Sequence, residues 1–150
     1  MDKGNMFRYK SQLTVGIIVM LLVAAVSCSG SQTAAPAENL AEASISELAD
    51  DVDVHTLAAV KDSEDVYLLD VREQWEYDEA HIPGVTLLPL GEVAGRLDEI
   101  PRDKEVIVTC RSGNRSGQVT DYLRQNGFDN VHNMTGGILD WQAAGYPVEP

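Results

Sequence analysis

Cys110 stands in the segment of this sequence whose residue types are best suited to chemistry. It begins the run Cys110-Arg111-Ser112-Gly113-Asn114-Arg115-Ser116, directly after an apolar stretch at 105–109. The thiolate is the nucleophilic form of cysteine, and nearby cations and N–H donors favour it over a free thiol, whose pKa is about 8.5. The arginines and polar residues argue against an apolar surrounding, and no histidine is adjacent to act as a general base. We therefore predict that Cys110 is a nucleophile that its loop keeps ionised.

The elements that must position this loop alternate between strand and helix. After a short opening turn at 45–48, apolar β-rich runs predict strands at 51–54, 66–71, 85–90, 105–109 and 130–134. Apolar side chains at helical spacing predict helices at 55–62, 91–100, 116–126 and 137–141. The run 85–90 is expected at an edge, because Pro89 cannot donate to a ladder. This order predicts an α/β fold with a small, mostly parallel sheet of about five strands and helices on both faces.

The loop joins the predicted strand 105–109 to the predicted helix 116–126. In a parallel sheet, ligands bind at the carboxyl ends of the strands. A short loop that contains glycine and leads into a helix can turn its N–H groups inward around an anion. The sequence therefore predicts a ring of amides around the Cys110 sulfur.

Composition limits the partners. Eleven Lys and Arg against twenty-four Asp and Glu in 150 residues give a net charge of −13. This sign disfavours nucleic acid, whose phosphates require a basic surface, although a local positive pocket could still bind a small anion. His55, His81 and His132 lack the spacing of metal ligands, so that we expect neither a metal site nor a cofactor.

Residues 1–27 have the features of a secretory signal peptide. Lys3, Arg8 and Lys10 precede an uncharged apolar run at 13–27. This run is shorter than the roughly 20 residues that span a bilayer as a helix. Its end, Ala25-Val26-Ser27-Cys28, resembles the lipobox of bacterial lipoproteins. The resemblance implies cleavage before Cys28 and lipidation of its sulfur.

The protein is therefore expected to be exported and lipid-anchored to the cell envelope. In a Gram-negative host it would lie on the periplasmic face, and Ser29 after the lipid site would favour the outer membrane. Residues 28–44 contain Ser, Ala, Gln, Thr and Pro without an apolar period, which predicts a flexible tether. Residues 45–150 remain as one folded domain.

Four segments of this domain together resemble the single-domain rhodaneses, which are sulfurtransferases. In chain order they are 69–73 with 76–77, then 81–84, 110–116 and 136–141. Ala80 and Val85 stand where the family usually has Gly and Ala. Both differences are apolar and lie away from the loop. The resemblance covers the whole domain and implies the same α/β fold.

The resemblance also implies a two-step transfer of sulfane sulfur. The Cys110 thiolate would take sulfur from a donor anion such as thiosulfate, hold it as a persulfide, and pass it to a thiol or to cyanide. The implied substrate-binding residues are Arg111, Ser112, Gly113, Asn114, Arg115 and Ser116. Their amides would stabilise the anionic sulfur as an oxyanion hole does. Arg115, together with Arg111, would hold the departing oxyanion.

Two other functions remain open at this point. A sulfur-carrier or redox relay that serves a partner protein would need the same loop, so that the sequence does not separate it from an enzyme. Phosphatases and arsenate reductases of the related fold have five residues between the cysteine and the arginine. Here four residues separate Cys110 from Arg115, and this tighter ring suits one sulfur atom better than a tetrahedral oxyanion.

The remaining polar residues receive structural interpretations. Asp70 and Arg72 lie at a predicted strand end, where we expect an ion pair, with Glu76 as the partner of Arg72. His81 precedes a Pro-Gly turn and is expected to tie it down by a hydrogen bond. Trp75 is expected at the rim of the pocket. Solvated faces are predicted for the acidic residues Asp50, Asp51, Asp53, Glu76, Asp78 and Glu79.

Overall fold

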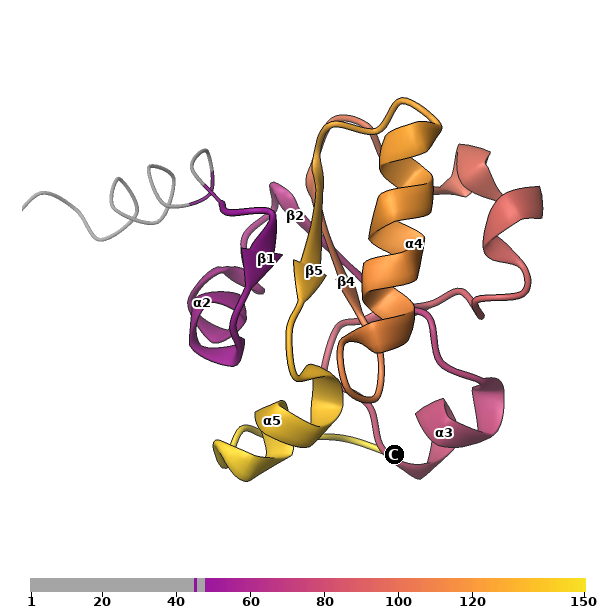
Figure 1. The fold of residues 1–150 in the computed structure, drawn as a ribbon. Helices are drawn as coiled ribbons and strands as arrows, with labels where there is room; N and C mark the ends of the chain where they lie inside the picture. The colour runs from indigo at the N-terminus through magenta and orange to yellow at the C-terminus, as the bar shows by residue number, and fades with distance from the viewer. Residues whose placement is uncertain (1–44, 46–47) are drawn as a thin grey trace, which may run out of the picture. The chain divides into compact units, whose positions relative to one another are not determined.

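The computed structural model describes residue 45 and residues 48–150 (Figure 1). Its elements are β1 (Asp51–Val52), α2 (Val54–Val60), β2 (Val66–Asp70), α3 (Gln74–Glu79), β3 (Thr86–Leu87), the 3₁₀ turns η1 (Val93–Gly95) and η2 (Leu97–Glu99), β4 (Glu105–Thr109), α4 (Asn114–Gln125), β5 (Val131–Met134) and α5 (Gly137–Ala143). The predicted signal peptide, the lipidation site Cys28 and the tether 28–44 lie outside the described residues, as does part of the opening turn. In the described part, no helix is long and apolar enough to cross a bilayer.

The five strands form one parallel sheet in the order β1-β5-β4-β2-β3. The predicted α/β fold is confirmed. β4 lies at the centre, paired with β2 along its whole length and with β5 over Val106–Val108, and β3 lies at an edge. Since parallel strands end on the same side, the carboxyl ends of β2 and β4 meet, with Asp70 opposite Thr109. Figure 1 shows α3 and α5 at this end of the sheet, where β4 runs into α4.

Two apolar clusters lie on opposite faces of the sheet, because successive side chains of a strand alternate. Leu68 and Ile107 belong to the first cluster, which α2 and α5 cover. Leu69 and Val108 belong to the second, which α4 and η1 cover. Cys110 follows β4 in the same alternation and therefore faces α4.

The helix predicted at 91–100 is wrong. Two 3₁₀ turns replace it, and the backbone between them, at Arg96, has φ −133° and ψ 30°, which is not helical. Gly95 has low helix propensity, and Pro101 disfavours a helical conformation of the residue before it. Val93 and Ile100 are still buried, because the turns keep both on the core side.

The sequence did not predict α3, and several element boundaries differ from the prediction by one to two residues or more. Two of these boundaries lie close to the site. α4 begins at Asn114 rather than Ser116, so that the end of the loop already has helical backbone. The strand predicted at 85–90 pairs as β3 over two residues, although Leu88 and Leu90 continue to donate hydrogen bonds to the β2 side. Pro89 lies between them without an N–H to donate.

Candidate active site

The Cys110 loop is shaped by glycine at two positions. Gly113 precedes α4 with φ 89°, and a Cβ there would lie 3.0 Å from the Gly136 amide nitrogen. Gly137 has φ 59°, and a Cβ there would lie 2.4 Å from the Cys110 carbonyl oxygen. A side chain would therefore be strained or excluded at both positions. Without side chains, the start of α5 approaches the loop closely enough for the Ile138 amide to donate to the Cys110 carbonyl at 2.9 Å.

Two hydrogen-bond donors of the loop lie within reach of the Cys110 sulfur. The Gly113 amide nitrogen lies 3.2 Å from Sγ, and the Ser116 hydroxyl oxygen lies 3.4 Å from it. Burial raises the pKa of this thiol. The hydrogen bonds from the Ser116 hydroxyl and amide, reinforced by the amides of Ser112 and Gly113, lower it by more. The net pKa of Cys110 is below its ordinary value, which favours the nucleophilic form.

The surroundings of Cys110 are less polar than the sequence predicts. The residue is 1% exposed and belongs to the apolar cluster under α4, with Val108 and Val119. The expectation of polar surroundings is therefore wrong for the side of Cys110 that packs against Val108 and Val119. The reason is the alternation along β4, which points the side chain of residue 110 to the same face as Val108. The side that faces the loop is lined with donors.

Arg115 is held by a carboxylate from a distant part of the chain. Its two Nη atoms donate to the two carboxylate oxygens of Glu76 at 2.6 and 2.7 Å. The hydrogen bonds from Arg115 lower the pKa of Glu76 to about 2, and Glu76 raises the pKa of Arg115. Glu76 is buried rather than part of the solvated face predicted for it. Through this pair, α3 holds the start of α4.

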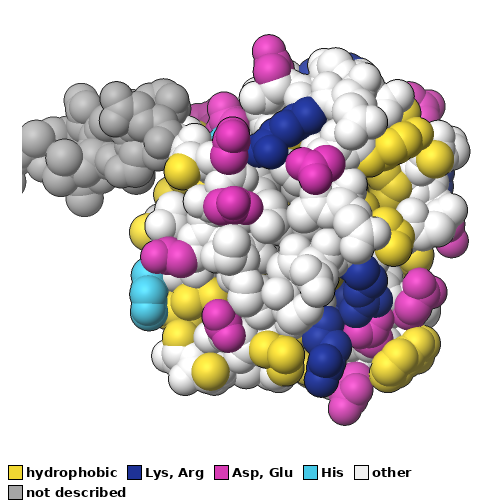
Figure 2. Space-filling model, viewed as in Figure 1, with side chains coloured by type: hydrophobic (Ala, Val, Ile, Leu, Met, Phe, Trp, Pro, Cys, Tyr) yellow, Lys and Arg dark blue, Asp and Glu magenta, His cyan; other side chains and the backbone are white. Residues whose placement is uncertain are grey.

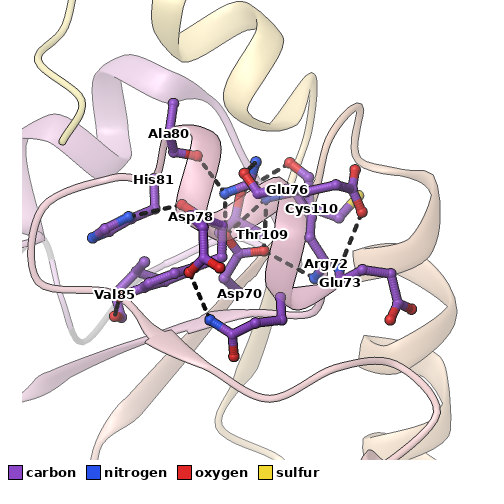
Figure 3. Close-up of polar contacts among 12 residues, drawn as sticks. Asp70, Arg72, Glu73, Glu76, Asp78, Ala80, His81, Val85, Thr109 and Cys110 are labelled. Carbon is purple, nitrogen blue, oxygen red and sulfur yellow. Dashed lines mark hydrogen bonds and ion pairs between the residues drawn. The ribbon is translucent and has the colours of Figure 1, made fainter. Parts of the chain in front are cut away.

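The predicted ion pair between Arg72 and Glu76 is also wrong. Arg72 pairs with Asp70 at 2.7 Å, and its Nη atoms donate to the backbone carbonyls of Glu76 and Ala80 (Figure 3). Asp70 is two residues away, and its carboxylate also accepts the Arg72 amide. Arg72 therefore pairs with the nearer carboxylate, that of Asp70, and the carboxylate of Glu76 pairs with Arg115. Both Asp70 and Arg72 are buried.

His81 connects the Pro-Gly turn to two neighbouring elements. Its Nδ1 lies 3.0 Å from the Tyr77 carbonyl of α3, and its ring stacks on that of Tyr77 with centroids 3.8 Å apart. Its backbone pairs with Glu149 near the end of the chain. These contacts to Tyr77 and Glu149 give His81 a structural role.

A cavity of about 290 Å³ opens beside the loop between α3 and α5. It is lined by Arg72, Trp75, Glu76, Glu79, Ala80, Arg111, Ile138, Leu139 and Gln142. Trp75 stands at this opening, 67% exposed. Arg111 is exposed there and forms no ion pair with any described residue. Figure 2 shows basic, acidic and apolar side chains gathered on the part of the surface between α5 and α3.

Sequence reasoning missed Asn133. Its side-chain oxygen accepts the Ser116 hydroxyl at 2.7 Å, and its nitrogen donates to Asp51 at 2.9 Å. Asp51 was expected only on a solvated face. One signal was available, because Asn133 is a polar residue inside a strand that begins with Val131 and ends with Met134. Among the described residues, no group of His, Cys, Asp and Glu is arranged to hold a metal ion.

Comparisons with known proteins agree with this geometry. The family model described as "Rhodanese-like domain" matches residues 53–144. A sulfurtransferase of Allochromatium vinosum is 38% identical over 102 residues, which cover 67% of this chain and 95% of that protein. A thiosulfate sulfurtransferase of Pseudoalteromonas translucida is 36% identical over 83 residues, 55% of this chain and 79% of that protein. The crystal structure of a rhodanese-related protein from Thermoplasma volcanium has a TM-score of 0.61 at 31% identity, over 67% of this chain and 98% of that one.

Proposed function

Because the chain belongs to the rhodanese-like domain family, we propose that it is a sulfurtransferase that carries sulfane sulfur on Cys110 as a persulfide. One observation carries the proposal. The buried Cys110 thiol lies at the carboxyl end of the central strand, and its sulfur is within hydrogen-bond distance of donors from its own loop. The same hydrogen bonds place its pKa below the ordinary value for cysteine. Relatives named sulfurtransferases agree with this class of reaction.

In the first step, the Cys110 thiolate attacks the outer sulfur of a donor such as thiosulfate. A bond forms between Sγ and that sulfur, the sulfur–sulfur bond of the donor breaks, and sulfite leaves with the electron pair. The resemblance implied that Arg115, together with Arg111, holds the departing anion, but the guanidinium of Arg115 is engaged by Glu76 in the structure. We therefore assign the anion to Arg111, which lies at the cavity. Charge-assisted hydrogen bonds of this kind are among the stronger ones in proteins.

In the second step, the thiolate of an acceptor attacks the outer sulfur of the persulfide. The acceptor takes that sulfur, and the electron pair of the broken bond returns to Cys110 as thiolate. The loop amides stabilise the anion at both stages, because donors that already point at developing charge need no reorganisation. Cyanide replaces the thiol in an assay and gives thiocyanate. In the cell, the acceptor thiol belongs to a small molecule or to a partner protein.

Export and lipid anchoring remain part of the proposal, through Cys28. Labelled palmitate should enter the full-length protein in a bacterial host and should not enter the Cys28→Ala variant. Equal labelling of both proteins would contradict the anchor without affecting the proposed reaction.

The proposed reaction is tested by mass. The protein, incubated with thiosulfate, should gain the mass of one sulfur atom, the Cys28→Ser variant should behave in the same way, and Cys110→Ser should gain nothing. Oxidation to a sulfinic acid adds nearly the same mass but is not reversed by a simple nucleophile. Cyanide should therefore remove the gain and yield an equal amount of thiocyanate. No gain on Cys110, or a gain that cyanide does not remove, would contradict the proposal.

A further inference from the structure

The Ser116 hydroxyl has one proton and three acceptors within reach. The Asn133 side-chain oxygen lies 2.7 Å from it, the Gly113 carbonyl oxygen 3.0 Å and the Cys110 sulfur 3.4 Å. A serine hydroxyl donates only one hydrogen bond at a time. The distances therefore describe a competition in which the shortest contact takes the proton away from the sulfur.

The orientation of the Asn133 amide decides this competition. Its nitrogen donates to an Asp51 carboxylate oxygen at 2.9 Å, which directs its oxygen toward Ser116. Asp51 and Asn133 are direct partners in the β1–β5 register, so that both side chains lie on the face of the sheet that α4 covers. If the amide were reversed, its NH₂ would donate to the hydroxyl oxygen, and the hydroxyl proton would be left to the Cys110 sulfur and the Gly113 carbonyl.

We propose that Asn133, oriented by Asp51, is a positioning residue that restrains the reactivity of Cys110 by competing with its sulfur for the Ser116 proton. With the thiol protonated, Ser116 donates to Asn133. When the thiol ionises, the hydroxyl turns toward the thiolate and gives up the bond to Asn133. The loss of that bond opposes ionisation. The pKa of Cys110 is thus lowered by less than the loop would allow if Asn133 did not compete for the Ser116 proton.

Other charged groups lie near Cys110, but they do not take part in the hydrogen bonding of the Ser116 hydroxyl. Arg111 and Arg115 both belong to the Cys110 loop, and Arg115 is paired with Glu76 of α3. On β2, Asp70 is paired with the nearby Arg72. Within the described residues, none of these groups hydrogen-bonds to the Ser116 hydroxyl or the Asn133 amide. Substitution of Asn133 therefore changes the hydrogen bonding of the sulfur without changing the charges around it.

The test measures the ionisation of Cys110 without a sulfur donor. The proposal rests on Cys110 as the nucleophile of the proposed function, but this measurement stays valid if no sulfur is transferred. The ultraviolet absorbance of the thiolate is followed against pH in the full chain. The curve of a matched Cys110→Ser protein is subtracted, which also removes the contribution of Cys28. Thermal unfolding of each variant shows that it is folded over the pH range used.

Asn133→Ala should lower the midpoint of this titration. A neutral hydrogen bond redirected to the thiolate corresponds to about a three- to tenfold increase in the thiolate fraction below the midpoint. Ser116→Ala should move the midpoint the other way. With Ser116→Ala already present, Asn133→Ala should have no further effect. An unchanged or raised midpoint in Asn133→Ala, or a shift that persists without the hydroxyl, would overturn the proposal.

Asp51→Ala provides a second variant that leaves Asn133 in place. It also removes a negative charge, which by itself favours the thiolate. Asp50→Ala is therefore the matched control, since Asp50 is the adjacent acidic residue and its carboxylate pairs with Arg124, whereas only its backbone carbonyl contacts Asn133. The midpoint should fall further in Asp51→Ala than in Asp50→Ala. Equal shifts in the two variants would overturn the role given to Asp51.

Discussion

Replacing Glu76 by glutamine would test how the active-site loop is held. Glu76 accepts both Nη atoms of Arg115, and this lowers its pKa from 4.5 to about 2. It also closes a capping box at the start of α3, where its carboxylate accepts the Glu73 amide. Glutamine can serve in a capping box. Glu76→Gln therefore removes the charge of the pair and keeps the shape and most of the local hydrogen bonding.

The size of the effect follows from the lowered pKa. Each unit corresponds to about 1.4 kcal/mol, so that the pair stabilises the folded state by roughly 3 kcal/mol in the absence of screening. The Arg115 side chain is 28% exposed, and solvent screens part of this energy. We expect Glu76→Gln to reduce the free energy of unfolding by about 2 kcal/mol at neutral pH.

The loss should depend on pH in a defined direction. The pKa of Glu76 is lower in the folded than in the unfolded protein, so that its contribution is fully present above about 4.5. The contribution is lost as the pH falls through about 2, where the native carboxylate takes up its proton. The difference between the two proteins should therefore shrink on acidification.

Urea unfolding of both proteins across this pH range would measure the difference. Glu99→Gln is the control, because Glu99 forms an exposed pair with Arg96, and exposed pairs contribute little to stability. If the two substitutions cost the same at neutral pH, or if the loss in Glu76→Gln were equal at all pH values, the reasoning would be refuted.

Three further predictions follow from the site and the core. Gly113→Ala should prevent sulfur loading of Cys110 and lower the thermal midpoint more than Gly127→Ala, because both glycines have positive φ but only at Gly113 would a Cβ meet the backbone; equal effects would contradict the close approach. Arg111→Ala should slow persulfide formation from thiosulfate about ten- to a hundredfold, measured as the rate of mass gain, with a smaller effect in high salt; an unchanged rate would remove Arg111 from the donor site. Trp141→Ala should cost about 3–5 kcal/mol in urea unfolding, as expected for a large buried aromatic residue, whereas Trp75→Ala, at an exposed position, should leave stability nearly unchanged.

The local features of the active site could be predicted from the sequence because they depend on neighbours along the chain. The Cys110 loop, the apolar run before it and the alternation of strands and helices are each contained in a short segment. Such segments carry their own periodicity and turn chemistry. The parallel sheet then follows from the order of the elements, since a strand that returns through a helix pairs in parallel.

The prediction of a helix at 91–100 failed because the spacing of apolar residues does not by itself identify the backbone conformation. The spacing of Val93, Leu97 and Ile100 fits a helix, and the first and last of these are indeed buried. Two 3₁₀ turns also place these residues on the core side. Apolar spacing alone therefore did not distinguish the two backbones, and Gly95 and the following Pro101 decided between them.

Which charged and polar groups meet across the fold was decided only by the tertiary structure. Arg115 and Glu76 are 39 positions apart, and Asn133 and Asp51 are 82 apart. The order of β1 and β5 and the placement of α3 beside α4 bring these pairs together. A charged side chain takes the partner that the fold places nearest, so that Arg72 has Asp70 and Arg115 has Glu76.

By itself, the amino-acid sequence determined that a thiol follows a buried strand and enters a loop of donors, because both features lie within one short segment of chain. It did not determine how strongly that thiol is hydrogen-bonded, or which of the two loop arginines is available to bind a substrate anion. Those properties depend on side chains from β1, α3 and β5, whose distances to the loop exist only once the sheet has formed.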